Sequence, residues 1–171
     1  VIAGQGTCGL EILEQLPDVD YVIGSIGGGG LMAGVGTVFR AIRPQTKVIG
    51  AQAQGAPAMV EALRAGKLIS TPKEGTFADG IAVAEASESM REILQGCIDE
   101  TLLADDEEIA AAILSLIEKG KVVAEGSGAV ALAALRKMRA QVKGKKVVLI
   151  LSGGNIDVNL VSRIIDRGLI E

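Results

Sequence analysis

The chain has 171 residues, no histidine, few aromatic residues, and 17 basic against 21 acidic side chains, which give a net charge of −4. Ser-His-Asp hydrolysis, imidazole catalysis and histidine-ligated metals are therefore excluded, and so are the basic stripe and stacking surface that nucleic-acid binders use. Two isolated cysteines and the lack of any apolar run of transmembrane length predict a cytoplasmic single-domain protein with an aliphatic core and no membrane partner.

Apolar runs of strand length alternate with segments of helical period along the chain. The runs are rich in β-branched residues and cover 21–26, 47–53, 98–103 and 146–152. Because they are hydrophobic almost throughout, we expect strands buried on both faces, as in a parallel sheet. The alternation predicts an α/β fold, an open doubly wound parallel sheet of about four strands with helices on both faces, flavodoxin- or Rossmann-like.

Three of the intervening segments place apolar residues on one helical face. The members of these faces are Leu31, Val35, Val38, Phe39 and Ile42; Ile109, Ile113, Leu116 and Ile117; and Val158, Val161, Ile164 and Ile165. Thr7 and Asp106 are predicted helix N-caps, and Asp157 is predicted to start the last helix. Pro57 suits a first helical turn. Glycines stand where helices should end, at Gly66, Gly120 and Gly168.

The first glycine-rich loop, Gly27-Gly28-Gly29-Gly30-Leu31, follows a predicted strand and opens a helix. Glycines let several backbone N–H groups approach a ligand, and the helix N-terminus adds partial positive charge, so the loop predicts a phosphate cradle. It is not a P-loop, since no Gly-Lys-Ser/Thr follows, and the Gly-x-Gly-x-x-Gly spacing is not clean. The alternative is a tight strand-to-helix turn without a ligand.

Two more glycine-rich loops are expected at the same edge of the sheet. Ser152-Gly153-Gly154-Asn155 follows the last strand, and Glu125-Gly126-Ser127-Gly128 opens a helix. Because ligands bind outside the carboxyl ends of parallel strands, these loops can face one ligand. Alternatively, Ser152 bonds to local backbone in a turn and Glu125 is an ordinary carboxylate at a helix start.

Residues 67–86 form the least regular stretch, and a loop of that length in a compact domain is usually functional. Asp79-Gly80 lies within it and by itself indicates only a turn. The acidic residues 105–108 are interpreted as a first helical turn rather than a cation site, and the basic residues of 136–146 as a solvated face. Because the chain opens in mid-pattern without an initiator methionine, we expect it to be part of a longer polypeptide.

Taken in order, five motifs resemble the threonine dehydratases, which are pyridoxal-phosphate enzymes of fold type II related to serine racemases and serine dehydratases. The motifs are Gly-Gln-Gly-Thr, Ser-Ile-Gly-Gly-Gly-Gly-Leu, Asp-Gly-Ile-Ala-Val, Ala-Glu-Gly-Ser-Gly-Ala and Leu-Ser-Gly-Gly-Asn-Ile-Asp, and they extend over essentially the whole of 1–171. The resemblance implies the cofactor-binding part of the larger domain of an L-threonine or L-serine ammonia-lyase. That enzyme class releases a 2-oxo acid and ammonia by β-elimination.

The resemblance also implies residue roles. The amides of Gly27, Gly28, Gly29, Gly30 and Leu31 would hold the phosphate of pyridoxal phosphate. The Ser152 hydroxyl, beside Gly153, would meet the pyridine nitrogen, Glu125 would flank the ring, and Gly80 would line the site by its backbone. A hydroxyl partner does not force protonation of the ring nitrogen, which suits β-elimination rather than transamination.

Some family features are expected to lie elsewhere or to differ. The Schiff-base lysine and the asparagine that meets the phenolic oxygen belong to a segment before Val1, so no catalytic residue is assigned here and the chain alone is expected to be inactive. The divalent-cation positions of serine racemases correspond to Gln52 and Ala58, so no metal site is predicted. Ala84-Glu85 stands where dehydratases often carry a basic pair, which leaves threonine or serine as the substrate. No regulatory domain is visible after Glu171.

Two other hypotheses stay open. A free-standing phosphate- or nucleotide-binding module would keep the glycine cradle but would not need Ser152 and Glu125 beside it. An isolated half-domain scaffold without catalysis would have identical residues. Where the chain lacks the amino-terminal partner segment, apolar surface should be exposed, so self-association into a homo-oligomer is expected.

Overall fold

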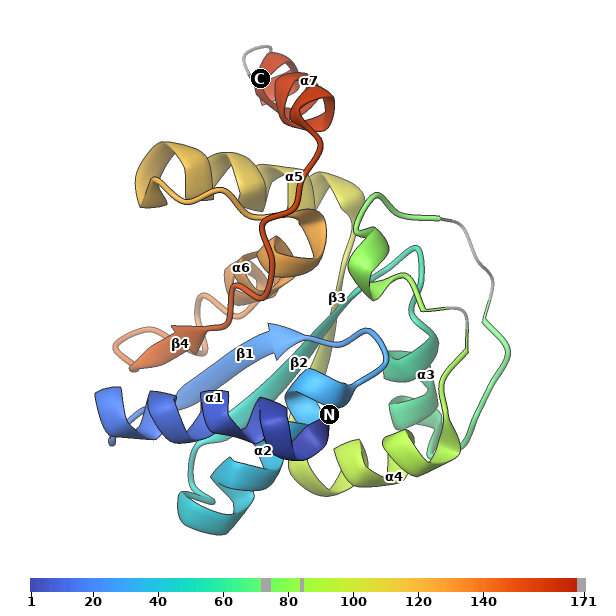
Figure 1. The fold of residues 1–171 in the computed structure, drawn as a ribbon, viewed down its shortest axis with the longest axis vertical. Coiled ribbons are helices and arrows are strands. Elements are labelled where there is room, and N and C mark those ends of the chain that lie inside the picture. The colour runs from blue at the N-terminus through green and yellow to red at the C-terminus, as the bar shows by residue number, and fades with distance from the viewer. Residues whose placement is uncertain (72–74, 84, 169–171) are drawn as a thin grey trace.

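The computed structural model describes residues 1–71, 75–83 and 85–168, which form helices packed around one sheet (Figure 1). The helices are α1 (Ile2–Gln15), α2 (Gly30–Ile42), α3 (Ala58–Ala65), α4 (Glu88–Cys97), α5 (Asp106–Ser115), α6 (Gly126–Lys137) and α7 (Val158–Gly168). The strands are β1 (Tyr21–Ser25), β2 (Lys47–Ala53), β3 (Glu100–Ala104) and β4 (Val147–Leu149). A 3-10 turn covers Asp79–Ile81 and a π-helical turn covers Leu116–Gly120. None of the helices in these described ranges is long and apolar enough to cross a membrane.

The four strands are all parallel, in the order β3-β2-β1-β4, which confirms the predicted sheet. This is the order of a Rossmann half rather than of flavodoxin, whose first three strands run 2-1-3. The chain moves outward from β1 through β2 to β3 and then returns to the other side of β1. The strand order therefore reverses between β1 and β4, and ligands of open α/β sheets bind at such a reversal.

Helices cover both faces of the sheet, as predicted. Val22 and Val48 share a core with α1, α2, α3 and α4, whereas Ile23 and Ile49 share one with α5, α6 and α7 (Figure 1). Neighbouring residues of a strand point to opposite faces, so one continuous apolar run supplies both cores. A Cβ on Gly50 would overlap the side chain of Ile26, which explains the glycine within β2.

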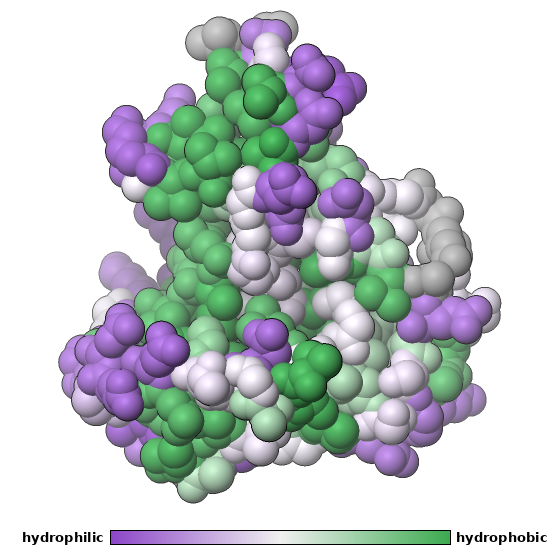
Figure 2. Space-filling view, viewed as in Figure 1, coloured by the Kyte–Doolittle hydropathy of each residue, from purple (hydrophilic) through white to green (hydrophobic). Residues whose placement is uncertain are grey.

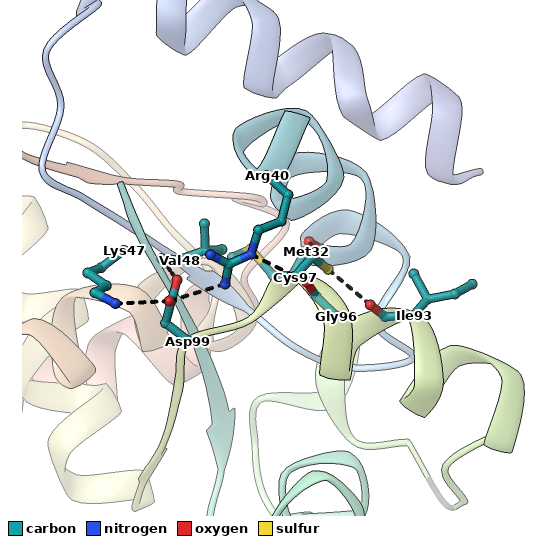
Figure 3. Close-up of polar contacts among 8 residues, drawn as sticks. All are labelled: Met32, Arg40, Lys47, Val48, Ile93, Gly96, Cys97 and Asp99. Atoms are coloured by element: carbon teal, nitrogen blue, oxygen red, sulfur yellow. Dashed lines mark hydrogen bonds and ion pairs between the residues drawn. The ribbon is translucent and has the colours of Figure 1, made fainter. Parts of the chain in front are cut away.

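A charge cluster ties together the elements at the amino ends of β2 and β3 (Figure 3). The Asp99 carboxylate lies 3.1 Å from Arg40 Nη2 and 3.2 Å from Lys47 Nζ, and it accepts a hydrogen bond of 2.8 Å from the Val48 N–H. Burial by itself raises the pKa of Asp99, but these hydrogen bonds outweigh it, so the pKa lies below its ordinary value. Nearby, the Cys97 thiol donates a hydrogen bond to the Ile93 carbonyl at 3.2 Å, and burial raises the pKa of this thiol.

Two predicted N-caps are wrong. Thr7 lies inside α1, where its hydroxyl donates to the Gly4 carbonyl at 2.8 Å. Asp105, not Asp106, caps α5, because its carboxylate accepts from the Glu108 N–H while the Glu108 carboxylate accepts from the Asp105 N–H. Asp106 instead accepts hydrogen bonds from the Thr76 hydroxyl and the Phe77 N–H, and so ties the irregular stretch to α5.

The other predicted boundaries differ by a few residues. Gly66 ends α3 with φ +68°, as predicted, whereas Pro57 is the N-cap of α3 rather than a residue of its first turn. The last strand is shorter than the predicted 146–152 because the chain leaves the sheet after Leu149. Asp157 caps the start of α7, where its carboxylate accepts from the Asn159 N–H at 2.7 Å.

The predicted apolar helix faces are confirmed only in part. Val35, Phe39, Ile109, Ile113 and Ile164 are buried. At the helix ends the prediction is wrong, since Ile42, the last residue of α2, is 60% exposed and Val158, the first residue of α7, is 80% exposed. On the face shown in Figure 2, apolar residues gather along α6 and β4, whereas one end of α1 and part of α7 are hydrophilic.

The predicted irregular stretch 67–86 contains one short element among its described residues, the turn Asp79–Ile81. Pro72-Lys73, whose residue types predict a turn, and Ala84 lie outside the described residues.

Candidate functional site

A pocket of about 490 Å³ opens at the carboxyl ends of β1 and β4, where the strand order reverses. It brings together the three predicted glycine loops and the Asp79-Gly80 turn, although they are far apart in sequence. Its lining residues are Gln5, Cys8, Ser25, Gly27, Gly28, Gly29, Gly30, Leu31, Gly80, Ile81, Glu125, Ser127, Ile150 and Ser152. Gly153 is not among them but lies against Glu125.

The loop between β1 and α2 has the geometry of an anion cradle. Gly29 is the N-cap of α2 with φ +95°, a left-handed conformation that side-chain-bearing residues rarely adopt. A Cβ on Gly29 would also lie 2.7 Å from Met90 Cγ, whereas a Cβ on Gly28 would meet nothing within 4 Å. Within the described part of the chain, the N–H groups of residues 27–29 donate to no backbone carbonyl. Unpaired amides, open space and a helix N-terminus together fit a phosphate group.

The Ser152 hydroxyl bonds across the sheet rather than within its own turn. Its Oγ lies 3.1 Å from the Oγ of Ser25, the last residue of β1. Ser25 is only 6% exposed, whereas Ser152 is exposed. Two neutral hydroxyls thus stand side by side in the lining of the pocket, where one proton of the pair remains free for an acceptor on a ligand.

Glu125 occupies a space that glycines leave open. It is the N-cap residue of α6, but its side chain makes no capping bond; its N–H donates to the Gly153 carbonyl at 3.1 Å. A Cβ on Gly153 would overlap Glu125 Oε1, and a Cβ on Gly80 would lie 3.6 Å from the same oxygen and 2.5 Å from Ser127 Oγ. The Ser127 hydroxyl is buried without a partner in the described structure. The carboxylate is therefore directed at the pocket rather than at its own helix.

Sequence reasoning did not assign four polar residues that line the pocket: Gln5, Cys8, Ser25 and Ser127. Gln5 and Cys8 come from α1, which packs closely on α2. The approach is so close that a Cβ on Gly34 of α2 would lie only 2.5 Å from the Ile2 carbonyl oxygen of α1. Burial and the nearby Glu11 carboxylate raise the pKa of Cys8, so its thiol stays protonated. Three of these residues, Gln5, Ser25 and Ser127, lie within family motifs, and that was the available signal.

The two positions that correspond to a divalent-cation site carry no carboxylate, and the Nε2 of Gln52 is buried without a partner among the described residues. The Gln52 side chain is buried, and its Oε1 accepts a hydrogen bond of 2.9 Å from the Val60 N–H in α3. Ala58, also buried, is the first residue of α3. Among the described residues, no group of three or more His, Cys, Asp or Glu side chains could hold a metal ion.

The lining of the pocket, as far as the structure describes it, includes no lysine. Lys73 lies outside the described residues. A second cavity of about 330 Å³ lies between α5 and α7 beside Phe77. None of its lining residues belongs to the glycine loops, so the pocket at the β1–β4 reversal is the candidate site.

Known proteins share this sequence pattern. A family model described as pyridoxal-phosphate dependent enzyme matches residues 1–153. The L-threonine ammonia-lyase of Thermotoga maritima is 49% identical over 171 residues, which are 100% of this chain and 42% of that protein. The catabolic L-threonine dehydratase of Escherichia coli K12 is 43% identical over 166 residues, 96% of this chain and 50% of that protein. The chain thus spans about half the length of the curated relatives it matches.

Solved structures share the fold. The processed form of threonine deaminase isoform 2 from Solanum lycopersicum has a TM-score of 0.91 and 38% identity, over 99% of this chain and 47% of that one. Maize serine racemase has a TM-score of 0.86 and 33% identity, over 99% of this chain and 53% of that one. These matches confirm the resemblance found in the five motifs and the predicted cofactor, pyridoxal phosphate. The chain therefore belongs to the family of pyridoxal-phosphate dependent enzymes.

Proposed function

We propose that this chain is the pyridoxal-phosphate-binding portion of the larger domain of an L-threonine or L-serine ammonia-lyase. The whole protein would remove the β-hydroxyl of its substrate and release a 2-oxo acid and ammonia, in the amino-acid metabolism of the cytoplasm, as in isoleucine biosynthesis. The observation that carries the proposal is the meeting of unpaired backbone amides and paired hydroxyls at one reversal of strand order. The names of the relatives, L-threonine ammonia-lyase and L-threonine dehydratase, support the substrate class.

Each part of the pocket has a task in this proposal. The amides of residues 27–31 donate to the phosphate oxygens, and the positive end of the α2 dipole stabilises their charge. Bound there, pyridoxal phosphate supplies an electron sink for chemistry at the Cα of an amino acid. Ser152 donates to the ring nitrogen, Glu125 flanks the ring in the space left by Gly153, and Gly80 lines the site by its backbone.

We also propose that residues 1–171 act as one structural unit of a longer protein. The family resemblance implies that the lysine that binds the cofactor lies outside residues 1–171, so the chain alone is expected to be inactive. Val1 is 94% exposed and Val123 is 58% exposed, so apolar surface is available for the rest of that protein. A homo-oligomer formed through this surface is a further expectation, and sedimentation of the chain over a range of concentrations tests it.

Calorimetric titration of the purified chain with pyridoxal 5′-phosphate tests the binding site. We expect saturable binding that inorganic phosphate weakens by competition. Gly28→Asp places a carboxylate in the open space of the cradle, so it should reduce affinity by about 100-fold or more through like-charge repulsion. Gly96→Asp in α4 is the matched control, because a Cβ there also meets nothing within 4 Å and the charge change is the same.

Other outcomes would favour other functions. A nucleotide or a sugar phosphate that binds as tightly as pyridoxal phosphate would favour a general phosphate-binding module. A folded chain that binds none of these ligands would contradict a preformed site. Addition of the corresponding amino-terminal half of a full-length relative would then show whether binding requires both halves.

A further inference from the structure

The hydroxyl pair of Ser25 and Ser152 differs in burial, and this difference sets the direction of its hydrogen bond. Ser25 is 6% exposed at the end of β1, whereas Ser152 is exposed in the loop after β4. Within the part of the chain that the structure describes, the 3.1 Å contact with Ser152 is the hydrogen bond that the Ser25 side chain makes. The distance alone leaves either oxygen as the donor.

The proton count decides between the two directions. Each hydroxyl has one proton to donate and can accept two hydrogen bonds. If Ser152 donated to Ser25, the proton of Ser25, which is only 6% exposed, would have no acceptor within the described protein, and an unsatisfied buried donor is costly. If Ser25 donates to Ser152, the remaining proton belongs to Ser152, which stands at the open pocket where a ligand or water can accept it. The second direction therefore satisfies both groups.

The sheet holds Ser25 in place for this task. Beyond the paired residues of β1 and β4, the Ile150 N–H still donates to the Ile23 carbonyl at 2.9 Å, so backbone bonding continues to within two residues of each serine. β1 lies between β2 and β4, where hydrogen bonds hold it on both sides. Ser25 thus lies on an inner strand that is held on both sides, whereas Ser152 lies in the loop after β4. A hydrogen bond from Ser25 can therefore orient the Ser152 hydroxyl.

We propose that Ser25 is a positioning residue, which donates its proton to Ser152 and so directs the Ser152 proton at the ring nitrogen of the cofactor. This inference rests on the proposed function, because it requires Ser152 to meet that nitrogen. A hydroxyl that receives one hydrogen bond becomes a better donor of another, since linked hydrogen bonds polarise each other. Ser25 therefore strengthens recognition of an unprotonated nitrogen through Ser152.

A cofactor analogue isolates the effect at the nitrogen. Pyridoxal phosphate and its deaza analogue, in which a C–H group replaces the ring nitrogen, are titrated into the 171-residue chain by calorimetry. The variants are Ser25→Ala, Ser152→Ala and the double variant, with Ser115→Ala in α5 as a matched control outside the pocket. We expect Ser25→Ala to weaken pyridoxal phosphate by about 3- to 10-fold, the size of one hydrogen bond, and to leave the analogue unchanged. The double variant should bind like Ser152→Ala, because Ser25 acts only through Ser152.

The outcomes separate this inference from the function on which it rests. If Ser25→Ala weakens both ligands equally, or if the two serine effects add independently, Ser25 does not act through Ser152 on the nitrogen and the inference is wrong. An unchanged affinity in Ser25→Ala, beside a nitrogen-specific loss in Ser152→Ala, would also overturn it but would leave the proposed site intact. If Ser152→Ala weakens both ligands alike, the Ser152 assignment itself fails and the inference fails with it. If the wild-type chain binds neither ligand, the preformed site on which the inference rests is contradicted.

Discussion

At the amino ends of β2 and β3, the Asp99 carboxylate is bonded to Arg40, Lys47 and the Val48 N–H (Figure 3). At the carboxyl ends of β1 and β4, the amides of residues 27–29 donate to no described backbone carbonyl, and the buried Ser127 hydroxyl has no described partner. The first region uses its polar groups to join elements, whereas the second leaves them available. At one end of the sheet the polar groups bond to one another and stabilise the fold. At the other end they remain available to a ligand, since a polar group already paired within the protein is not free to bind one.

The largest expected effect comes from disturbing the close approach of two loops at the binding end. In Gly128→Ala, the new Cβ would overlap the Gly153 carbonyl, and backbone cannot move aside cheaply. We expect a loss of about 3 kcal/mol in the free energy of unfolding, measured with urea. Gly96→Ala is the control, because its Cβ meets nothing within 4 Å and alanine favours the helix. Equal stability of the two variants would contradict the close contact.

Breaking the amino-end cluster should reduce stability without affecting binding. Asp99→Ala leaves the Val48 N–H without its carboxylate acceptor, and we expect a loss of about 1–2 kcal/mol in the free energy of unfolding. The ion pairs add little, since Arg40 and Lys47 are 34% and 56% exposed. Asp99→Asn retains an acceptor oxygen and should lose less. A change in pyridoxal-phosphate affinity in either variant would show that the two ends are not independent.

Gly153→Ala should weaken binding while leaving stability nearly unchanged, the reverse of what is expected for the Asp99 variants. The new Cβ would overlap only the far end of the flexible Glu125 side chain, which can move, so stability should change by less than about 1 kcal/mol. Displacement of the carboxylate from the pocket should weaken pyridoxal phosphate by about 10-fold. Paired denaturation and titration curves test this, and a destabilised variant with unchanged affinity would refute it.

Acid should weaken the amino-end cluster selectively. The pKa of Asp99 is lowered in the folded chain, so its stabilising contribution is present above its ordinary pKa, about 4, and is lost as pH falls through the lower folded value. The difference in unfolding free energy between wild type and Asp99→Asn should therefore shrink as pH falls below about 4. Urea denaturation over a pH series measures it, and a difference that does not depend on pH would rule out the lowered pKa.

The smallest effect is expected at Ser127. Its hydroxyl is buried without a described partner, so Ser127→Ala removes an unsatisfied group and should change stability by less than about 0.5 kcal/mol, in the stabilising direction. Thermal denaturation against wild type measures the change. A clear loss of stability would mean that the hydroxyl is paired in solution.

Much of the fold could be predicted because its signals are local. An almost continuous apolar run such as 47–53 marks a buried parallel strand, and β2 has those bounds. The glycine cradle could also be predicted from the sequence, since four consecutive glycines between a strand and a helix specify a sharp turn with accessible amides. The exact start of a helix could not be predicted where adjacent residues are chemically alike. Asp105 and Asp106 are an example, because either carboxylate could cap α5.

By itself, the sequence determined the alternation of strands and helices, the positions of the glycine loops and the resemblance that identifies the family. Only the tertiary structure decided that Ser25 meets Ser152 across 127 residues and that Glu125 fits against Gly153. It also decided that α1 brings Gln5 and Cys8 to the pocket. The physical reason is that periodicity and turn chemistry depend on neighbouring residues, whereas these contacts depend on the strand order β3-β2-β1-β4 and on backbone-to-backbone helix packing, which no local pattern encodes.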